Sequence, residues 1–509
     1  MVLHSRVSTL ATRQQVGLVL GPALFTGFLL FPSFNISPSA NAALASTLWI
    51  AAWWITEAIP IPATSLLPIV LFPLTGVVDA TGATAPYADP VVFLLLGGFL
   101  LALGIERWDL HRRIALTVVS LVGVRADRLL LGFMIATAFL SMWISNSATA
   151  MLMVPIGTAV IISVGTVDES DRALVEGDEE DELVVGVRTD PDDRPATDFG
   201  LALMLGIAYS ASIGGVATLI GSPPNAVFAG IAASRLDVQI SFLDWLVFAG
   251  PLSIVFLFVT WLLLVKLLRP EIPLDRGAET VVRVQREELG RISRGERRVL
   301  VVFTLVAAGW LLRPFVLQSL FPAITDTVIA IVGGVLLFVV PVDYENREFL
   351  LDWSDAIRLP WGVLLLLGAG FSLANGFRES GLDTVIAQGF AGIAGVPVVV
   401  LILVIATVVV FLTEVTSNTA TATVFMPIMI SLGVTLGESP LMLMATAALA
   451  ASMAFMLPVA TPPNAIVFGS GYVTIPQMSR IGLWLNLLGI VAIIVLTYLW
   501  LPIAFAFAG

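Results

Sequence analysis

The stretch SNSA at residues 145–148 returns almost unchanged as SNTA at residues 417–420, 272 positions later. Ser141 and Thr413 keep the same separation. The chain therefore contains a duplicated unit. Both copies place small hydroxyl and amide side chains inside otherwise apolar sequence, where a membrane protein would normally have only apolar residues.

A second motif is also duplicated, as GSPPNA at 221–226 and ATPPNA at 460–465, but here the separation is 239 positions. The shortfall of 33 positions equals the length of the segment 166–198, which carries thirteen acidic residues and three arginines. Such a composition favours disorder. We therefore expect an acidic, disordered cytoplasmic insert in the first copy.

The composition is that of a membrane protein, with 58% apolar and only 12% charged residues, against about 25% charged residues in soluble proteins. Apolar runs such as 245–265 and 481–506 reach the ~20 residues that a helix needs to cross a bilayer. The short alternating segments of a transmembrane β-barrel are absent from the sequence. The sequence predicts an all-α polytopic membrane protein.

Other features narrow the setting. The chain has no cysteine and only two histidines, which argues against thiolate chemistry and metal centres. No apolar core with a small-residue cleavage site follows the basic start, so we expect no removable signal peptide. Residues 266–298 hold nine Lys/Arg against six acids, which places this segment and the amino terminus in the cytoplasm. Arginine replaces lysine nearly everywhere and the net charge is −12, as in a prokaryotic, salt-adapted host.

The polar motifs interrupt the predicted spans. Apolar arms at 127–144 and 148–165 flank the first Ser-Asn motif, and arms at 397–414 and 420–436 flank the second, as in re-entrant hairpins. Tandem prolines break the spans at 200–236 and 441–464 because they remove backbone donors. Interrupted segments at matching places in two halves are typical of inverted-repeat secondary transporters. We expect about 11 transmembrane helices, two re-entrant hairpins and two broken helices.

The tips suit both a cation and an anion. Free N–H groups at a helix start favour an anion. Free carbonyls, hydroxyls and amide oxygens suit a hard cation such as Na⁺. A single Ser-Asn-Ser in a membrane helix more often joins helices, and a single Pro-Pro more often kinks one, but two copies of each in order favour a binding role. For Glu57 and Glu414 a structural role is favoured, and we expect Glu106 to pair with Arg107.

With these residues identified, the chain resembles the divalent anion:sodium symporter family, which includes dicarboxylate, citrate and sulfate carriers. The motifs that carry the resemblance are SMWISNSATA (141–150), TEVTSNTATA (413–422), the two Pro-Pro-Asn turns and Thr56-Glu57-Ala58 with Pro60. The resemblance implies a homodimer in the plasma membrane that works by an elevator mechanism, with scaffold and transport regions. The expected regions are a scaffold region (1–124), the first hairpin (125–165), the insert (166–198), a transport region (199–268, broken at 221–225), a cytoplasmic linker (269–298), a second scaffold region (299–388), the second hairpin (389–436) and a second transport region (437–509, broken at 460–464).

The resemblance also implies the site residues and the cargo, a divalent anion moving with at least two Na⁺ ions. One sodium site is implied at Ser141, Ser145, Asn146 and Gly221, and another at Thr413, Ser417, Asn418 and Ala460. The implied substrate ligands are Ser145, Asn146, Ser147, Ser222, Ser417, Asn418, Thr419, Thr461 and Pro462. Ser147 departs from the family's usual threonine, which makes the choice of anion less certain than the coupling to sodium.

The function expected from these residues is sodium-coupled import of a divalent anion, with a C4-dicarboxylate such as succinate or malate as the first choice. Sulfate or citrate symport and sodium-independent exchange are the alternatives within transport. A channel, a receptor and an intramembrane hydrolase are the alternatives outside it. A hydrolase would need a serine with a basic partner, and no apolar segment offers one, so we expect no enzyme. We also expect no nucleic-acid partner.

Overall fold

The computed structural model describes residues 12–31, 36–123, 125–165, 198–269, 277–390, 392 and 395–507. These residues are almost entirely helical, as predicted, with one short pair of antiparallel strands, β1 (Pro341–Asp343) and β2 (Glu348–Phe349). The expected acidic insert at 166–198 lies outside the described residues, apart from its last residue, Asp198.

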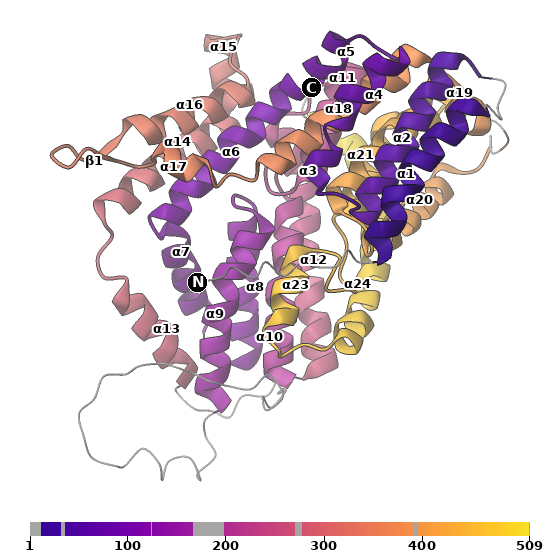
Figure 1. The fold of residues 1–509 in the computed structure, drawn as a ribbon. Helices are drawn as coiled ribbons and strands as arrows, with labels where there is room; N and C mark the ends of the chain where they lie inside the picture. The colour runs from indigo at the N-terminus through magenta and orange to yellow at the C-terminus, as the bar shows by residue number, and fades with distance from the viewer. Residues whose placement is uncertain are drawn as a thin grey trace, which may run out of the picture. The chain divides into compact units, whose positions relative to one another are not determined.

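Figure 1 labels the helices in the order in which they follow one another along the chain. In the first half they are α1 (Thr12–Leu30), α2 (Pro38–Thr56), α3 (Ile61–Thr64), α4 (Leu67–Thr75), α5 (Ala80–Thr84), η1 (Ala85–Ala88), α6 (Pro90–Arg107), α7 (Leu110–Val122), α8 (Ala126–Ser141), α9 (Asn146–Gly165), α10 (Asp198–Val216), α11 (Pro223–Leu236) and α12 (Phe242–Leu268). In the second half they are α13 (Gly277–Glu288), α14 (Arg294–Leu312), η4 (Arg313–Leu317), α15 (Gln318–Leu320), α16 (Asp326–Val339), α17 (Trp353–Ala356), α18 (Trp361–Ser380), α19 (Leu382–Phe390), α20 (Val398–Thr413), α21 (Asn418–Leu436), α22 (Pro440–Ala451), α23 (Pro462–Gly469), α24 (Ile475–Val495), η6 (Leu496–Trp500) and α25 (Leu501–Phe507).

Local sequence explains where several helices begin. Ser37 accepts a hydrogen bond from the Ala40 N–H, and Pro38 occupies the first position of α2, where a missing donor costs nothing. Reciprocal capping boxes start α12 at Ser241 and α14 at Ser293. Each box satisfies backbone N–H groups that the first turn of a helix leaves without an intrahelical partner.

The chain divides into two compact units. Unit 1 consists of Met1–Leu95, Pro223–Ile240 and Pro360–Ala451, and unit 2 consists of Leu96–Ser222, Ser241–Leu359 and Ser452–Gly509. The chain passes from one unit to the other at both broken spans, after Ser222 and after Ala451. Units are defined by packing in one conformation, so the expected division into scaffold and transport regions stays a prediction.

Each unit combines the two copies of the duplicated sequence. In unit 1, helix α11 from the first copy packs against α21 and α22 from the second. In unit 2, helix α23 from the second copy packs against α9 and α10 from the first. The short helix that follows each Pro-Pro motif is therefore exchanged between the copies.

Within the described residues, seven helices are long and apolar enough to cross a membrane: Ala80–Arg107, Asn146–Ser163, Asp198–Val216, Phe242–Leu268, Arg294–Leu320, Asn418–Leu436 and Ile475–Phe505. Four shorter apolar helices accompany them: Ile61–Thr75, Asp326–Val339, Val398–Thr413 and Pro440–Ala451. The all-α membrane class is thus confirmed. The count of about 11 transmembrane helices, the hairpins and the inversion of the repeats stay predictions.

The break in the second copy is longer than expected. The sequence predicted a span to residue 457, but α22 ends at Ala451 and helix resumes only at Pro462. Pro458 disfavours helix at the residue before it. The Asn464 Nδ2 atom also donates to the carbonyls of Ala454 and Leu457, at 3.2 and 3.0 Å, and so replaces hydrogen bonds that a helix would have supplied.

The expected pair between Glu106 and Arg107 is wrong. Arg107 instead forms ion pairs with Asp352, at 2.8 Å, and with Asp355. Both partners lie at the start of the short helix α17, 245 positions or more away in sequence. No local sequence pattern therefore predicts them.

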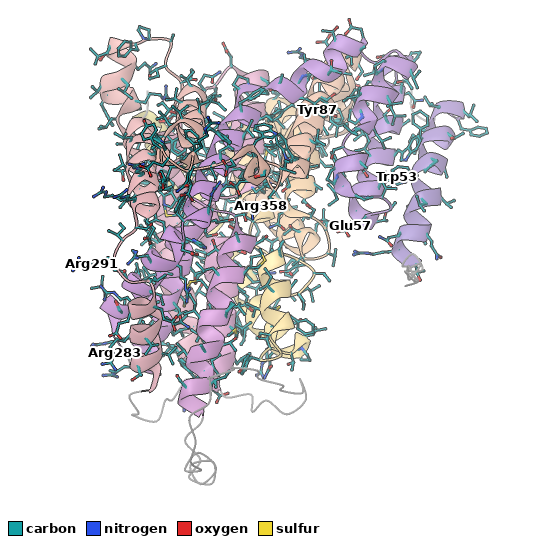
Figure 2. All side chains as sticks on the ribbon, turned by 60° about the vertical axis from the view of Figure 1, so that its left-hand side comes forward. Trp53, Glu57, Tyr87, Arg283, Arg291 and Arg358 are labelled. Carbon is teal, nitrogen blue, oxygen red and sulfur yellow. The ribbon has the colours of Figure 1, made fainter. Side chains whose placement is uncertain are left out.

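The basic segment after α12 includes α13 and the start of α14. Figure 2 shows Arg283 and Arg291 at the edge of the ribbon with their side chains directed away from it. Arg283 is 65% exposed and pairs only weakly with Glu287, at 3.9 Å. Solvated arginines of this kind fit the cytoplasmic side that the sequence predicts for this segment.

Candidate functional site

The first tip joins α8 to α9 and brings three oxygen atoms together. The Ser141 hydroxyl lies 2.5 Å from the Asn146 Oδ1 atom and 2.7 Å from the Ala211 carbonyl oxygen of α10. Ser141 is fully buried. A hydroxyl has one proton, so it can satisfy only one of these two acceptors at a time. The cluster therefore places three neutral oxygens close together.

The first Pro-Pro break lies against the same cluster. A Cβ atom on Gly221 would stand 2.6 Å from the Gly215 carbonyl oxygen and 3.0 Å from the Ser141 carbonyl oxygen. A Cβ atom on Gly215 would stand 2.4 Å from the Asn146 Oδ1 atom. Only glycine permits such an approach. The structure thus brings together Ser141, Asn146 and Gly221, three of the residues implied for the first sodium site.

Thr218 connects this break to the tip. Its hydroxyl donates to the Met142 carbonyl at 2.5 Å and accepts from the Gly221 N–H at 3.0 Å. Thr218 is fully buried. It is a positioning residue that was not predicted from the sequence, although a buried threonine three residues before a Gly-Ser-Pro-Pro break is a usable signal.

The second tip, in unit 1, repeats the arrangement. The Thr413 hydroxyl lies 2.7 Å from the Asn418 Oδ1 atom and 3.0 Å from the Ala451 carbonyl oxygen of α22. Thr413 is also fully buried. One proton again faces two acceptors. The same oxygen cluster therefore occurs twice, once in each copy.

The second break, in unit 2, is held by its own side chains. The Thr461 hydroxyl accepts from the Asn464 N–H at 3.3 Å and so caps α23. Asn464 is fully buried, and in the described residues its Oδ1 atom has no hydrogen-bond partner. Ala460 is buried beside Thr461. This break presents a buried amide oxygen that can accept a further ligand.

The remaining residues implied by the sequence differ in their surroundings. The Ser145 hydroxyl accepts from the Ala148 N–H at 3.2 Å and helps to start α9. The Ser222 hydroxyl lies 3.3 Å from the hydroxyl of Ser452 and is buried. The other four residues differ in burial: Ser147 and Ser417 are half-buried, Thr419 is buried and Pro462 is exposed.

These clusters suit a small cation without fixed charge. All of their oxygens are neutral hydroxyl, amide or carbonyl oxygens, which hard cations bind. Among the residues that the structure describes, no three His, Asp or Glu side chains gather as a metal centre would require. No ion pair of the described residues includes a member of 141–150. The two clusters can therefore bind a small hard cation through neutral oxygens.

Two of the cluster oxygens could not be predicted from the sequence. The carbonyls of Ala211 and Ala451 belong to ordinary helical residues, 10 and 9 positions before the glycine or alanine of each break. Every residue carries a carbonyl, so only the packing of α10 against α8, and of α22 against α20, selects these two.

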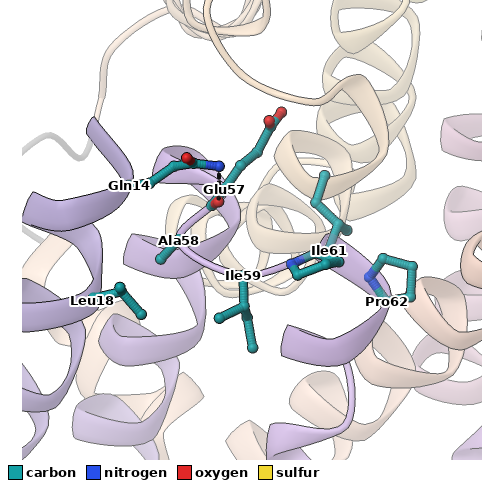
Figure 3. Close-up of a pocket in the computed structure, with 8 residues that line it drawn as sticks. Gln14, Leu18, Glu57, Ala58, Ile59, Ile61 and Pro62 are labelled. Carbon is teal, nitrogen blue, oxygen red and sulfur yellow. Dashed lines mark hydrogen bonds between the residues drawn. The ribbon is translucent and has the colours of Figure 1, made fainter. Parts of the chain in front are cut away.

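A cavity lies away from the second tip in unit 1, between α1 and the turn from α2 to α3 (Figure 3). Its volume is about 660 Å³, and its lining is mainly apolar, with Gln14 and Glu57 as the polar members. The Gln14 Nε2 atom donates to the Glu57 carbonyl at 3.2 Å, and Arg13 pairs with the Glu57 carboxylate at 2.9 Å. The charged member of this lining is a carboxylate rather than a cation, which disfavours an anion, so we do not assign the substrate to this cavity.

Comparison with known proteins agrees with this chemistry. The chain is 43% identical to the sodium-dependent dicarboxylate transporter SdcS of Staphylococcus saprophyticus over 494 residues, which is 96% of this chain and 92% of that protein. It is 42% identical to SdcS of Staphylococcus aureus strain MRSA252 over 498 residues, or 97% of this chain and 92% of that protein.

Two solved transporter structures share the fold at low sequence identity. MtrF of Neisseria gonorrhoeae matches with a TM-score of 0.57 and 13% identity over 97% of this chain and 96% of its own. YdaH of Alcanivorax borkumensis matches with a TM-score of 0.52 and 15% identity over 82% and 87%. The model of the sodium:sulfate symporter transmembrane region matches residues 13–506. The chain is therefore a membrane transporter, not an enzyme, and it belongs to the sodium:sulfate symporter family, the divalent anion:sodium symporters that its sequence resembles.

Proposed function

We propose that the protein is a sodium-coupled secondary active symporter that imports a C4-dicarboxylate such as succinate or malate. The observation that supports this best is the duplicated oxygen cluster, built on Ser141 and Asn146 in one copy and on Thr413 and Asn418 in the other. Each cluster gathers a hydroxyl, an amide and a carbonyl oxygen, the neutral ligands that suit a hard cation. A Na⁺ ion at each cluster makes at least two sodium ions per cycle.

The dicarboxylate is proposed from the relatives and from the charge balance. The SdcS proteins, which match nearly the whole chain, are named as sodium-dependent dicarboxylate transporters. Two Na⁺ ions offset the two charges of a dicarboxylate, so neutral tips suffice to hold it. The substrate ligands proposed here are the hydroxyl and amide groups of both tips, with Ser222, Thr461 and Pro462 from the breaks.

We propose further that the protein works as a homodimer in the plasma membrane, with its amino terminus in the cytoplasm. The basic segment 266–298 supports this orientation. The transport regions would move as one body past the scaffold regions, in an elevator mechanism. Sliding one element past another would leave buried amides and carbonyls unpaired, at a cost of several kcal/mol in lipid. A moving body that keeps its hydrogen bonds avoids that cost.

Uptake of labelled succinate into proteoliposomes tests the function directly. We expect uptake that needs an inward sodium gradient and that malate inhibits, whereas sulfate and citrate inhibit weakly. Undiminished uptake with choline in place of sodium on both sides would reject symport in favour of exchange. Sodium-dependent uptake of labelled sulfate, with no uptake of succinate, would keep the sodium coupling and reject the dicarboxylate.

A further inference from the structure

One ion pair differs from the others in what it joins. Most ion pairs of the described residues lie within the proposed scaffold regions, or between these and the linker at 269–298. Among the described residues, the pair of Arg235 with Asp383 alone joins a proposed transport region to a proposed scaffold region. Both residues belong to unit 1, so their contact is defined within one compact body.

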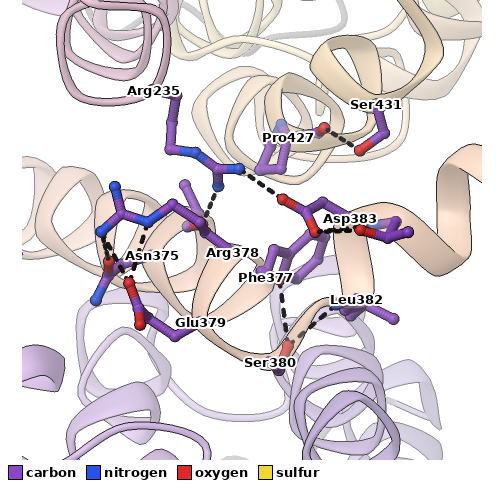
Figure 4. Close-up of polar contacts among 12 residues, drawn as sticks. Arg235, Asn375, Phe377, Arg378, Glu379, Ser380, Leu382, Asp383, Pro427 and Ser431 are labelled. Carbon is purple, nitrogen blue, oxygen red and sulfur yellow. Dashed lines mark hydrogen bonds and ion pairs between the residues drawn. The ribbon is translucent and has the colours of Figure 1, made fainter. Parts of the chain in front are cut away.

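Arg235 reaches from the end of α11 to two partners (Figure 4). Its Nη2 atom lies 2.9 Å from the Asp383 carboxylate at the start of α19, and its Nη1 atom donates to the Ala374 carbonyl of α18. The side chain is only 8% exposed, whereas Asp383 is 25% exposed. A guanidinium this well covered needs its partners, because an unpaired buried charge is costly.

The acceptor side is fixed to the scaffold by further hydrogen bonds. The Ser372 hydroxyl donates to the Ala83 carbonyl at 2.9 Å, and the Asn375 amide donates to the Gly82 carbonyl at 3.2 Å, so α18 is tied to α5. The Ser37 hydroxyl, before α2, donates to the Ser380 carbonyl at the turn between α18 and α19. These hydrogen bonds tie the helix that carries the Ala374 carbonyl, and the turn just before Asp383, to α5 and to the start of α2.

The donor side belongs to the proposed transport region at 199–268. Arg235 is the charged residue of α11, a helix that packs against α21 and α22. The contact between α11 and α18 is close, since a Cβ atom on Gly230 would stand 2.2 Å from the Phe371 ring. Phe371 itself is 3% exposed. Any displacement of α11 along α18 must therefore uncover Phe371 and break the pair at Arg235.

A second carboxylate is available nearby. A cavity of about 110 Å³ adjoins Arg235, and its lining includes Asp89, Asn375 and Arg378. Asp89 lies just before α6, in the first proposed scaffold region, where it accepts from the Val91 N–H at 2.9 Å. When Arg235 leaves Asp383, this cavity offers space and a replacement acceptor.

We propose that Arg235 is a latch that holds the transport region against the scaffold in one state of the cycle, bound to Asp383 and the Ala374 carbonyl, and that it must release for substrate to cross. The proposal rests on the elevator mechanism proposed above. It predicts that the latch residues control movement without taking part in binding.

The test uses a single reporter thiol, because the chain has no native cysteine. In a Phe371→Cys protein, the thiol lies beneath α11 while the latch is closed. We expect slow labelling by a small maleimide, with a rate that depends on sodium and succinate. Adding Arg235→Gln or Asp383→Asn raises the labelling rate about tenfold and removes its dependence on both ions. Combining Arg235→Asp with Asp383→Arg restores slow, ion-dependent labelling.

Arg378→Gln is the matched control. Arg378 lines the same cavity, but its guanidinium binds Glu379 and Asn375 of its own helix, so its loss should change the labelling rate less than twofold. Thermal unfolding midpoints show whether each variant is folded. Unchanged labelling in folded Arg235→Gln, or equal effects of Arg235→Gln and Arg378→Gln, overturns the latch. Failure of the wild-type protein to take up succinate with sodium would instead overturn the proposed function, since the labelling is measured independently.

Discussion

A single hydroxyl proton shared between two acceptors is the central feature of the site at the scale of one residue. Ser141 faces the Asn146 Oδ1 atom and the Ala211 carbonyl, and Thr413 faces the Asn418 Oδ1 atom and the Ala451 carbonyl. Each cluster therefore joins a hydroxyl, an amide and a carbonyl oxygen, all of them neutral. These are ligands that suit a hard cation such as Na⁺.

The asparagine amides have a second task that a carboxylate cannot perform. Each amide offers an acceptor oxygen to the cation and N–H donors to the anion. We expect Asn146→Asp and Asn418→Asp to keep or strengthen sodium binding, because the carboxylate adds negative charge. Succinate affinity should fall roughly 10- to 100-fold, as the loss of a hydrogen bond to a charged group costs about 1.5–3 kcal/mol. Isothermal titration with each ion separates the two effects.

The control for this pair of variants is Asn41→Asp. Asn41 is 4% exposed in α2, and its amide donates to the Phe28 carbonyl at 2.7 Å, away from the tips. It should lose stability and keep its succinate affinity. Near-normal succinate affinity in both tip variants would show that the asparagines only support the fold.

How far the site follows from sequence differs from residue to residue. The side chains of Ser141, Asn146, Thr413 and Asn418 were predicted because their pattern is duplicated, and the structure brings each pair together. The carbonyls that complete the clusters carry no sequence signal. The predicted partner of Arg107 was wrong for a related reason, since the residues that pair with it lie far along the chain.

At the scale of elements, Thr218 holds the first tip and the first break in register. It bonds to the Met142 carbonyl after α8 and to the Gly221 N–H at the break. Thr218→Val keeps the volume and removes both bonds. We expect a loss of about 1–3 kcal/mol in stability, because two buried polar groups lose a partner, together with a higher sodium concentration for half-maximal uptake.

Thr260→Val provides the comparison for that variant. Thr260 is equally buried, and its hydroxyl donates to the Phe256 carbonyl of its own helix at 2.8 Å. It should leave the sodium dependence unchanged, and Thr218→Ser should recover some of what Thr218→Val loses. Identical sodium dependence in the two valine variants would mean that Thr218 has no influence on the cation site.

The elements also show where sequence patterns stop being informative. Tandem prolines mark where α11 and α23 begin, but the end of α22 at Ala451 depends on Pro458 and on the Asn464 side chain, which act together only in three dimensions. The exchange of α11 and α23 between the copies leaves no trace in hydropathy, because a buried helix is equally apolar against either neighbour.

At the scale of the whole molecule, the proposed elevator mechanism makes opposite predictions for two aromatic contacts, both within unit 2. Phe242 of α12 stacks on Trp310 of α14 with ring centroids 4.6 Å apart. Phe242 belongs to the proposed transport region at 199–268 and Trp310 to the proposed scaffold region at 299–388. Phe248 of α12 stacks on Phe505 of α25 with centroids 5.6 Å apart, and both belong to proposed transport regions.

A moving transport body must separate the first contact and preserve the second. Cysteines in place of Phe242 and Trp310, bridged through two disulfides by a short bis-methanethiosulfonate reagent, should therefore abolish sodium-driven succinate uptake, and reductant should restore it by cleaving those disulfides. The same treatment of cysteines at positions 248 and 505 should leave most of the uptake intact, because that bridge lies inside the moving body. Both variants must transport before bridging, which checks that the loss of each aromatic pair is tolerated. Continued uptake with positions 242 and 310 bridged would require the site to open and close around a static body, since α12 could no longer travel past α14.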